Sequence, residues 1–527
     1  MESYGYNDNR VPCSKHTTWI PRGGVGIRMA RHGALIVFLA AASIISAFSL
    51  SAQTAAPKLA AAPATIPALF ISDIHYDPLR DPALAPRLNT APASQWPAIL
   101  ATPTSPTIAQ DYAAVQAACP TRGYDPDQAL WQSTLAALRA HAANSRFAVL
   151  SGDLLPHNFE CRYRFLFPKA THADYLNFTL NTLRYVVSSL RATLPGIPLY
   201  IALGNNDTAC TGNSLDASND FLALTAQVVA EALPPASRKS VLQGLATGGY
   251  YSVPMAAPMQ HTRLLVVDNL FFLTEYSTCA KQKDYSEETA QITWLNTQLA
   301  LARRHHEKVW VVGHVPPGVS LYTSFLNHRN ICGGQAPAMS LHSEQLAQAL
   351  GSYSDIVRLA IFAHTHSDAF ALLTPTLGDP GPTPPSYRIG VPVKIVASVS
   401  PINGNNPSFT LATVDPASST LRDYTVIESS NLTGVEATWA KQYTYSEDYA
   451  EPDFSSSSLS GLIAQLRADP KAASSASQAY LAHHYSTGAA AAILKLYWPV
   501  YVCAMDHDSA QSFVDCTCST PNLPPVP

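Results

Sequence analysis

Acidic, histidine and asparagine side chains follow five short apolar runs of the sequence, each at the carboxyl end of its run. In chain order these groups are Asp73-Ile74-His75, Gly152-Asp153 with His157, Gly204-Asn205-Asn206-Asp207, Gly313-His314 and His364-Thr365-His366. Carboxylate oxygens, amide oxygens and imidazole nitrogens bind divalent metal ions, and one carboxylate can bridge two ions. One such group would be weak evidence, but five in order predict a two-metal site of the kind used in metal-ion catalysis.

The spacing within the groups also suits a shared centre. In Asp73-x-His75 and His364-x-His366, residues two apart project to the same side if the backbone is extended. Gly152, Gly204 and Gly313 stand immediately before expected ligands. Because glycine lacks a Cβ, it permits unusual backbone dihedral angles and a close approach to a metal centre.

The apolar runs predict the strands that position these groups. They lie at 68–72, 147–151, 199–203, 262–268, 308–312, 357–362 and 393–398. Helical patterns lie between them at 128–143, 175–193, 288–305 and 343–350. Strands that alternate with helices predict an α/β fold, whose ligands bind at the carboxyl edge of the sheet.

The remaining segments carry weaker signals. The stretch 80–126 is rich in Pro and Ala and predicts a surface loop, and 374–385 predicts a Pro/Gly loop. After about residue 430 no further strand is predicted. Leu459–Ala468 and Ala472–Tyr497 predict helices, which lead into the cysteine-containing segment 503–518.

The amino terminus has the layout of a secretory signal peptide. Its apolar run, Ala34–Phe48, has 15 residues, which is short for a membrane span of about 20. Basic residues precede the run and small residues follow it. We therefore expect residues 1–52 to be an N-terminal extension and signal peptide, with Met29 as a possible true start, followed by an Ala/Pro-rich linker at 53–66. The protein would then be secreted or periplasmic without a stable membrane span, the alternative being an uncleaved anchor.

Export changes how the nine cysteines are interpreted. Cys13 lies upstream of the predicted cleavage point, and eight remain: Cys119, Cys161, Cys210, Cys279, Cys332, Cys503, Cys516 and Cys518. An even number in an exported chain predicts disulfides, with free buried thiols as the alternative. Cys516 and Cys518 are too close for easy mutual pairing, and Cys503 is one near candidate partner. The sequence leaves the connectivity open.

Composition excludes some classes of protein. The 527 residues carry a formal charge of −4, and 13% of them are charged. This balance argues against nucleic acid as the main partner, because such proteins usually present a concentrated basic face. The hydrophobic share of 47% excludes disorder of the whole chain.

The order of the five groups resembles the calcineurin-like metallophosphoesterase family over roughly residues 67–400. Finer motifs resemble its acid sphingomyelinase and acid sphingomyelinase-like phosphodiesterase branch, with endopolyphosphatases nearby: Asp73-Ile74-His75-Tyr76-Asp77-Pro78, Gly313-His314-Val315-Pro316-Pro317-Gly318 and Asn405-Asn406-Pro407. The resemblance implies a four-layer αββα sandwich as the catalytic domain at 67–430. It also implies a helical, Cys-containing subdomain at 431–527.

The resemblance also implies which residues bind the ions. One ion would be held by Asp73, His75, Asp153 and His366, and the other by Asp153, Asn205, His314 and His364. Asp153 would bridge them, and a hydroxide between the ions would attack phosphorus. Pro156 stands where purple acid phosphatases carry a Tyr, so zinc is expected, with Mn or Fe as alternatives. No other cofactor is expected.

Two further residues are expected at the substrate. His157 matches a His that follows the Gly-Asp motif in this branch, which implies that it steadies the phosphate or protonates the leaving oxygen. The alternative is an ordinary loop or helix-start residue. Asn206 stands where most of the family has His, and it can hydrogen-bond a phosphate oxygen but cannot act as an acid. The Gly-Asn-Asn-Asp motif also resembles endopolyphosphatases, whose leaving group is a phosphate.

The expected function is that of an exported two-metal phosphodiesterase of the acid sphingomyelinase-like type. Its substrate would be a small phosphoester: a nucleotide, a phosphocholine-type lipid headgroup or polyphosphate. Residues 53–66 are too few for a lipid-engaging saposin module, so efficient attack on bilayer lipid is not expected. The alternatives are an endopolyphosphatase-like hydrolase of phosphoanhydride bonds and a non-catalytic metal-binding protein. The complete set of seven expected ligands argues against the last.

Overall fold

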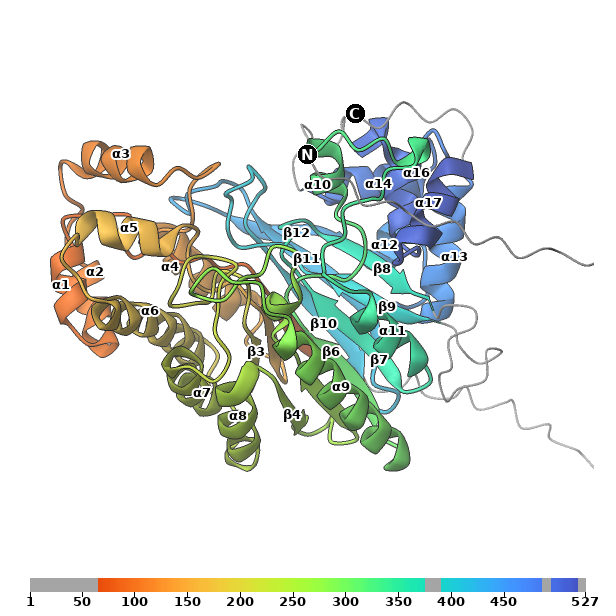
Figure 1. Cartoon of the computed structure of the whole chain (residues 1–527), viewed down its shortest axis with the longest axis horizontal. Coiled ribbons are helices and arrows are strands. Elements are labelled where there is room, and N and C mark those ends of the chain that lie inside the picture. Colours follow the sequence, from red (N-terminus) through yellow and green to blue (C-terminus); the bar gives the residue numbers. More distant parts are fainter. Residues whose placement is uncertain (1–64, 375–389, 486–493, 520–527) are drawn as a thin grey trace, which may run out of the picture. The chain divides into compact units, whose positions relative to one another are not determined.

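Two six-stranded sheets form the centre of the protein (Figure 1), for which a computed structural model describes residues 65–374, 390–485 and 494–519. The first sheet has the order β12 (Trp439–Thr444), β11 (Thr420–Ser429), β10 (Ser408–Asp415), β1 (Ile66–Ile71), β2 (Ala148–Ser151) and β3 (Leu199–Ala202). The second has the order β4 (Tyr251–Pro254), β5 (Thr262–Val266), β6 (Lys308–Val312), β7 (Val357–Phe362), β9 (Val391–Ile395) and β8 (Ala369–Leu373). Strands β1, β2 and β3 are parallel, as are β5, β6, β7 and β9.

The two sheets pack face to face through large aromatic side chains. Trp310 of β6 meets the rings of Phe70 and Phe147 edge-on, at centroid distances of 6.0 and 5.7 Å. Its indole N–H donates to the carbonyl oxygen of Ser419 at 2.8 Å. Both faces of these strands are buried, so their sequences are continuous apolar runs. This pattern made the strands predictable.

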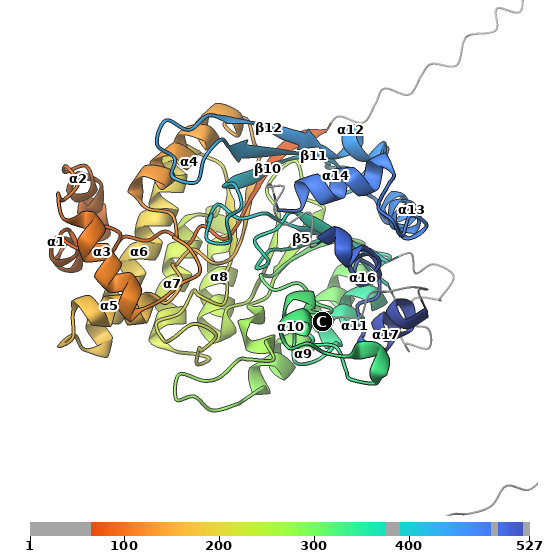
Figure 2. The ribbon, with the colours of Figure 1, turned by 90° about the horizontal axis from the view of Figure 1, so that it is seen from above.

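Helices cover the outer faces of the sheets (Figures 1 and 2). On the side of the first sheet lie α4 (Gln128–His141), α6 (His172–Thr193) and α7 (Asp220–Glu231). Helix α8 (Pro235–Gly248) packs against α7 and against β4 of the second sheet. Against the second sheet lie α9 (Ser286–Arg304) and α11 (Gln345–Ser352). These four layers confirm the predicted αββα sandwich. The seven predicted strands and the four helices predicted among them are all present.

The expectation that strands stop near residue 430 was wrong. Strand β12 pairs antiparallel with β11, from Thr425 opposite Thr444 to Ser429 opposite Trp439. It is an edge strand, and most of its residues are exposed or half-buried. Its sequence therefore lacks the apolar run that marked the central strands, and the first sheet extends past the expected domain boundary.

The expectation of a surface loop at 80–126 was also wrong. This stretch forms three short helices, α1 (Ala85–Thr90), α2 (Trp96–Leu100) and α3 (Ile108–Ala118). Proline occupies an early position of α1 and α2, where its missing N–H is no loss. Leu88, Trp96 and Val115 are fully buried. The prolines that suggested a loop therefore begin helices.

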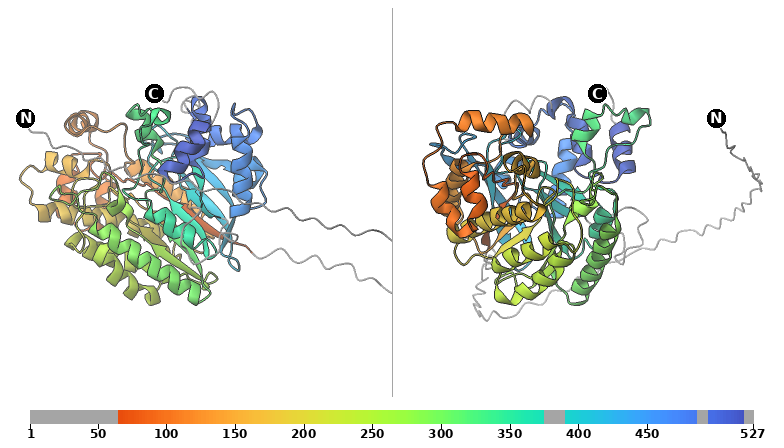
Figure 3. Two further views of the ribbon diagram at one scale, coloured as in Figure 1. Left: turned by 45° about the vertical axis from the view of Figure 1, so that its right-hand side comes forward. Right: turned by 60° about the vertical axis from the view of Figure 1, so that its left-hand side comes forward.

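The C-terminal region is helical and is fastened by disulfides. It contains α12 (Tyr445–Tyr449), α13 (Ser456–Arg467), α14 (Ser475–His483), α16 (Trp498–Ala504) and α17 (Ala510–Ser519). The disulfide Cys332–Cys518 joins α17 to the segment after α10 (Leu321–Leu326), where the blue and green helices meet (Figure 3). The predicted helix at 459–468 is confirmed as α13. The helix expected at 472–497 is confirmed over α14, whereas 486–493 lie outside the described residues.

The eight cysteines that follow the expected signal form four disulfides among the described residues, which confirms the predicted use of cysteine. The pairs are Cys119–Cys161, Cys210–Cys279, Cys332–Cys518 and Cys503–Cys516. As expected, Cys516 and Cys518 do not pair with each other.

The expected signal peptide at 1–52 lies outside the described residues, as does the linker apart from Thr65 and Ile66. Ile66 already belongs to β1. Most of the Pro/Gly loop expected at 374–385 also lies outside them. Within the described ranges, no helix is long and apolar enough to cross a membrane.

Candidate metal centre

All seven expected metal ligands come together where β1, β2, β3, β6 and β7 end. Six of the seven are buried and His364 is half-buried. Groups of Asp and His side chains here bring possible ligand atoms within 4.8 Å of one another, and Asn205 lies among them. The loops after parallel strands meet at one edge, which is why residues up to 293 positions apart in the sequence share one site.

The first set comprises Asp73, His75, Asp153 and His366. Nε2 of His75 lies 3.4 Å from Oδ2 of Asp153 and 3.7 Å from Oδ1 of Asp73. Nε2 of His366 lies 3.5 Å from the same Oδ1 atom. Ligands at about 2.0–2.2 Å from a zinc ion stand roughly 3–3.6 Å apart, so the spacing suits such an ion.

The second set comprises Asp153, Asn205, His314 and His364. Nε2 of His314 lies 3.1 Å from Oδ2 of Asp153 and 3.0 Å from Oδ1 of Asn205. Nδ1 of His364 lies 2.8 Å from the same Asn205 oxygen. Oδ2 of Asp153 thus faces both sets.

Two buried polar atoms of the first set indicate that a cation fits here. Oδ1 of Asp73 and Nε2 of His75 have no hydrogen-bond partner among the described residues. An unsatisfied carboxylate oxygen and imidazole nitrogen are costly to bury, and a divalent cation would satisfy both. The residues present therefore fit a centre of divalent metal ions.

Hydrogen bonds from the far side of two imidazoles fix their orientation. Nδ1 of His75 lies 2.8 Å from the carbonyl oxygen of Leu155, and Nδ1 of His314 lies 2.7 Å from that of Ser151. In the neutral ring, an Nδ1–H that donates to a carbonyl leaves Nε2 unprotonated as an acceptor toward the centre.

The ligand-bearing backbone is left-handed rather than extended. The φ angles are +46° for Asp73, +44° for His75, +57° for Asp153, +67° for His364 and +59° for His366. The expectation of extended backbone in Asp73-x-His75 and His364-x-His366 was therefore wrong. The strands end before these ligands begin. Non-glycine residues in this conformation are strained, and such strain concentrates at functional sites.

Two glycines beside the ligands allow the loops to approach closely. Gly152 has a φ of +99°, and a Cβ there would lie 2.6 Å from Nδ1 of His314. A Cβ on Gly204 would overlap the carboxylate of Asp153. Any larger residue at these positions would push the ligand loops apart.

The four histidine ligands fall into two groups, two with a lowered pKa and two with a raised pKa. Burial lowers the pKa of His364 to about 4 and that of His366 to about 3, so both are neutral, as metal binding requires. Burial also opposes charge on His75 and His314, but the carboxylates of Asp153 and Asp73 together with weaker contacts outweigh it and raise the pKa to about 9 and about 10. A cation must displace those two protons when it binds.

Asp207 has a structural role that sequence reasoning did not assign. Its Oδ1 accepts from the backbone N–H groups of Leu154 and Leu155 at 2.8 and 3.0 Å, and its Oδ2 accepts from that of Gly204 at 2.9 Å. Burial, followed by the charge of Asp153, raises its pKa to about 7. It ties the loop after β2 to the loop after β3. Its position next to an expected ligand in Gly-Asn-Asn-Asp indicated a role near the site, but the sequence does not show which backbone amides it binds.

His157 lies beside the first set and is held there by Asp125. Its Nδ1 is 3.0 Å from Oδ1 of Asp125, and its backbone N–H donates to Oδ2 at 2.9 Å. The imidazole stacks on His75 with a centroid distance of 3.9 Å. Asp125 was missed because it stands at the end of the stretch expected to be a loop. Burial opposes its charge, but His157 and then His75 and Arg162 lower its pKa overall.

Asn206 is turned toward Asp153. Its backbone N–H donates to Oδ1 of Asp153 and its side-chain amide donates to Oδ2, both at 2.8 Å. The expected contact with a phosphate oxygen therefore requires the amide to turn away from this carboxylate. Beside Asn206 lies a cavity of about 240 Å³, lined by Pro120, Thr121, Arg122, His157, Asn158, Asn206, Ile402 and Asn403.

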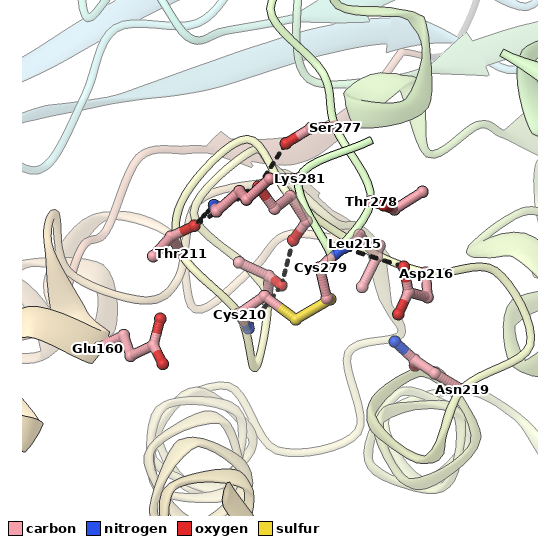
Figure 4. Close-up of a disulfide and its surroundings, with 12 residues drawn as sticks. Glu160, Cys210, Thr211, Leu215, Asp216, Asn219, Ser277, Thr278, Cys279 and Lys281 are labelled. Carbon is pink, nitrogen blue, oxygen red and sulfur yellow. Dashed lines mark hydrogen bonds between the residues drawn. A yellow bond between two sulfur atoms is a disulfide. The ribbon is translucent and has the colours of Figure 1, made fainter. Parts of the chain in front are cut away.

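The disulfide Cys210–Cys279 tethers the loop that carries Asn205 (Figure 4). Within that loop the N–H of Asn213 donates to the carbonyl of Asn205 at 2.9 Å, and the N–H of Ser277 donates to the carbonyl of Asn213 at 3.1 Å. The N–H of Cys279 donates to Asp216 at 2.9 Å. The disulfide and these hydrogen bonds together connect the ligand loop to the segment before α9.

Replacing both Cys210 and Cys279 by Ser should therefore loosen a ligand loop as well as destabilise the fold. We expect a loss of stability of about 2–4 kcal/mol and a fall in kcat/KM of roughly 10-fold. Thermal unfolding and p-nitrophenyl ester turnover measure the two effects. The matched control replaces Cys503 and Cys516, whose disulfide joins α16 to the C-terminal α17. Equal losses of kcat/KM in the two variants would contradict a local effect on the centre.

Comparison with known proteins gives a consistent assignment. A family model described as calcineurin-like phosphoesterase matches residues 66–368, more than half of the chain. The cyclic GMP-AMP phosphodiesterase SMPDL3A of Rattus norvegicus is 25% identical over 310 residues, covering 56% of this chain and 63% of that protein. The acid sphingomyelinase-like phosphodiesterase 3b of Mus musculus is 24% identical over 414 residues, covering 76% and 79%.

Two further similarities were found. The sphingomyelinase phosphodiesterase C of Dictyostelium discoideum is 25% identical over 246 residues, covering 46% of this chain and 48% of that protein. A dimetal phosphatase from Danio rerio aligns with 72% of this chain and 100% of its own, at 13% identity and a TM-score of 0.36. The chain thus spans less than two thirds of the length of several curated relatives. The residues that the family model matches include all five ligand groups, and the chain belongs to the calcineurin-like phosphoesterase family.

Proposed function

We propose that this protein is an exported two-metal phosphoesterase that hydrolyses a small phosphodiester. The observation that carries the proposal is the position of Oδ2 of Asp153, which lies 3.4 Å from Nε2 of His75 and 3.1 Å from Nε2 of His314. One carboxylate oxygen facing two sets of ligands is the arrangement that a bridging ligand requires. The names of the relatives, a cyclic dinucleotide phosphodiesterase and sphingomyelinases, support a phosphodiester substrate.

The ions would be held by the two sets of four residues that share Asp153. When bound, two divalent cations lower the pKa of water and stabilise negative charge on phosphoryl oxygens. Zinc is the proposed metal because imidazole and carboxylate ligands suit it, with Mn or Fe as alternatives.

The residues of the chain would orient the substrate and move a proton. Asp125 accepts from Nδ1–H of His157, which leaves Nε2 to carry the second proton of an imidazolium. That proton can pass to the leaving oxygen as its bond to phosphorus breaks. Asn206 would supply amide donors to a phosphate oxygen.

A second candidate is hydrolysis of phosphoanhydride bonds, as in endopolyphosphatases. Asn206 favours it, because an amide cannot donate a proton as an acid and a phosphate leaving group needs little acid help. Export is supported by the four disulfides, which persist in oxidising compartments.

Metal removal provides the direct test. We expect the protein to hydrolyse bis-p-nitrophenyl phosphate, to lose this turnover after dialysis against a chelator, and to regain it with Zn²⁺, Mn²⁺ or Fe²⁺. Elemental analysis should find about two ions per chain before dialysis. A protein that keeps two ions but cleaves neither bis-p-nitrophenyl phosphate nor p-nitrophenyl phosphate would instead be a metal-binding protein without turnover.

A further inference from the structure

The cavity beside the metal centre extends from His157 and Asn206 to Arg122. Its lining includes His157, which stacks on His75, and Asn206, which donates to Asp153. It also includes Arg122, an exposed residue between α3 and α4. A substrate that reaches from the centre into this cavity would therefore lie beside Arg122.

The charge of this lining favours an anion. Arg122 is the only residue among the eight that is always charged, and none of the eight is a carboxylate. Asn158, another lining residue, is the N-cap of α5 (Phe159–Leu166), and its side chain makes no capping hydrogen bond. The positive end of the helix adds to the attraction for negative charge.

We propose that Arg122 binds a second phosphate of the substrate, next to the one that reacts. This inference rests on the proposed two-metal phosphoesterase function. Of its two candidate reactions it favours hydrolysis of phosphoanhydride bonds, in a substrate with adjoining phosphates, either a nucleoside polyphosphate or inorganic polyphosphate. A guanidinium suits this role because its planar fork of N–H donors matches phosphate oxygens in pairs.

The surroundings of Arg122 hold it at the cavity. Its guanidinium lies over the ring of Tyr322 in α10, 5.1 Å from the ring centroid, and it hydrogen-bonds the Tyr322 hydroxyl. Tyr322 lies 200 positions further along the chain. The contact therefore joins two separate segments, which positions the arginine before a substrate arrives.

The same contacts disfavour a choline headgroup. A quaternary ammonium ion is recognised by open faces of aromatic rings, but no Trp, Tyr or Phe is among the eight lining residues. Of the two exposed tyrosines nearby, Tyr322 carries Arg122 on its ring and Tyr124 carries Arg80, 4.3 Å from its centroid. A cationic headgroup would therefore meet the positive charge of a guanidinium instead of open aromatic rings.

The test compares Arg122→Gln with wild type on four substrates: inorganic tripolyphosphate, ATP, bis-p-nitrophenyl phosphate and p-nitrophenyl phosphorylcholine. We expect kcat/KM to fall about 10- to 100-fold for tripolyphosphate, ATP or both, because a charge-assisted contact is lost. We expect less than about a 3-fold change for the two nitrophenyl esters, which lack a second phosphate. Arg80→Gln is the matched control, because Arg80 stacks on Tyr112 and Tyr124 and does not line the cavity.

Separate outcomes distinguish failure of this inference from failure of the proposed function. Equal losses of kcat/KM on all four substrates, or no loss on either tripolyphosphate or ATP, would overturn the role of Arg122. Neither result would contradict the proposed phosphoesterase function. Wild-type protein that cleaves none of the four would overturn the proposed function. The Arg122 contact is then still measured by calorimetric binding of methylenediphosphonate, which should weaken about 10-fold in Arg122→Gln but not in Arg80→Gln. Unchanged binding would overturn the inference.

Discussion

Replacement of Asp153 by Asn is expected to abolish turnover and to remove metal from both sets of ligands. In the structure Oδ2 of this carboxylate faces His75 on one side and His314 on the other. Burial opposes its charge, but those two histidines and the backbone N–H of Asn206 lower the pKa of Asp153 well below its usual range. An amide removes that charge and directs an N–H₂ group toward neighbours that already donate.

We expect kcat/KM to fall at least about 1,000-fold, because losing even a hydrogen-bond partner of a metal ligand costs about 10- to 100-fold. Metal content, measured by elemental analysis, should fall from about two ions per chain to below one. His366→Asn removes a ligand of the first set only, so it should leave about one ion bound. Asp515→Asn, an exposed position in α17, is the control for the chemical change alone.

The comparison of the two ligand variants makes the result decisive. If Asp153→Asn retains both ions, or loses no more metal than His366→Asn, Asp153 does not bridge two ions. Thermal unfolding in the presence of chelator separates this effect from misfolding, because no metal-dependent stability remains under that condition.

The ligand groups were predictable because each follows the end of a buried parallel strand. Asp73, Asp153 and His314 each stand two positions beyond the ends of β1, β2 and β6. A strand that is buried on both faces is visible as an apolar run, and the carboxyl ends of neighbouring parallel strands lie at one edge of the sheet. Strand ends plus residue type were sufficient to predict that these side chains meet.

The residues that support the ligands could not be found in this way. Asp125 follows no strand and acts through a contact with His157, and Asp207 acts through backbone amides of another loop. The left-handed backbone of the ligands was also missed, because spacing in sequence does not determine φ. Likewise, Cys332 and Cys518 pair across 186 residues, a distance over which sequence gives no choice among partners.

His157→Gln is expected to slow hydrolysis in proportion to how much help the leaving group needs. Glutamine keeps hydrogen-bonding ability but cannot deliver a proton, so loss of acid catalysis should cost about 100- to 1,000-fold in kcat for an alkyl phosphodiester. For bis-p-nitrophenyl phosphate, whose leaving group departs without a proton, the loss should be only a few-fold. Rates over a series of leaving groups measure this dependence, and His305→Gln at the exposed end of α9 is the control.

The role of Asp125 makes this expectation sharper. Because Asp125 contacts both Nδ1 and the backbone N–H of His157, Asp125→Asn should impair the same step by misorienting the imidazole. The double variant should then be no slower than His157→Gln, since residues that act through one group are not additive. Losses that are the same for every leaving group would mean that His157 binds the phosphate and gives no proton. Additive losses would mean that Asp125 acts apart from His157, through its contacts with Ser400 or Arg162.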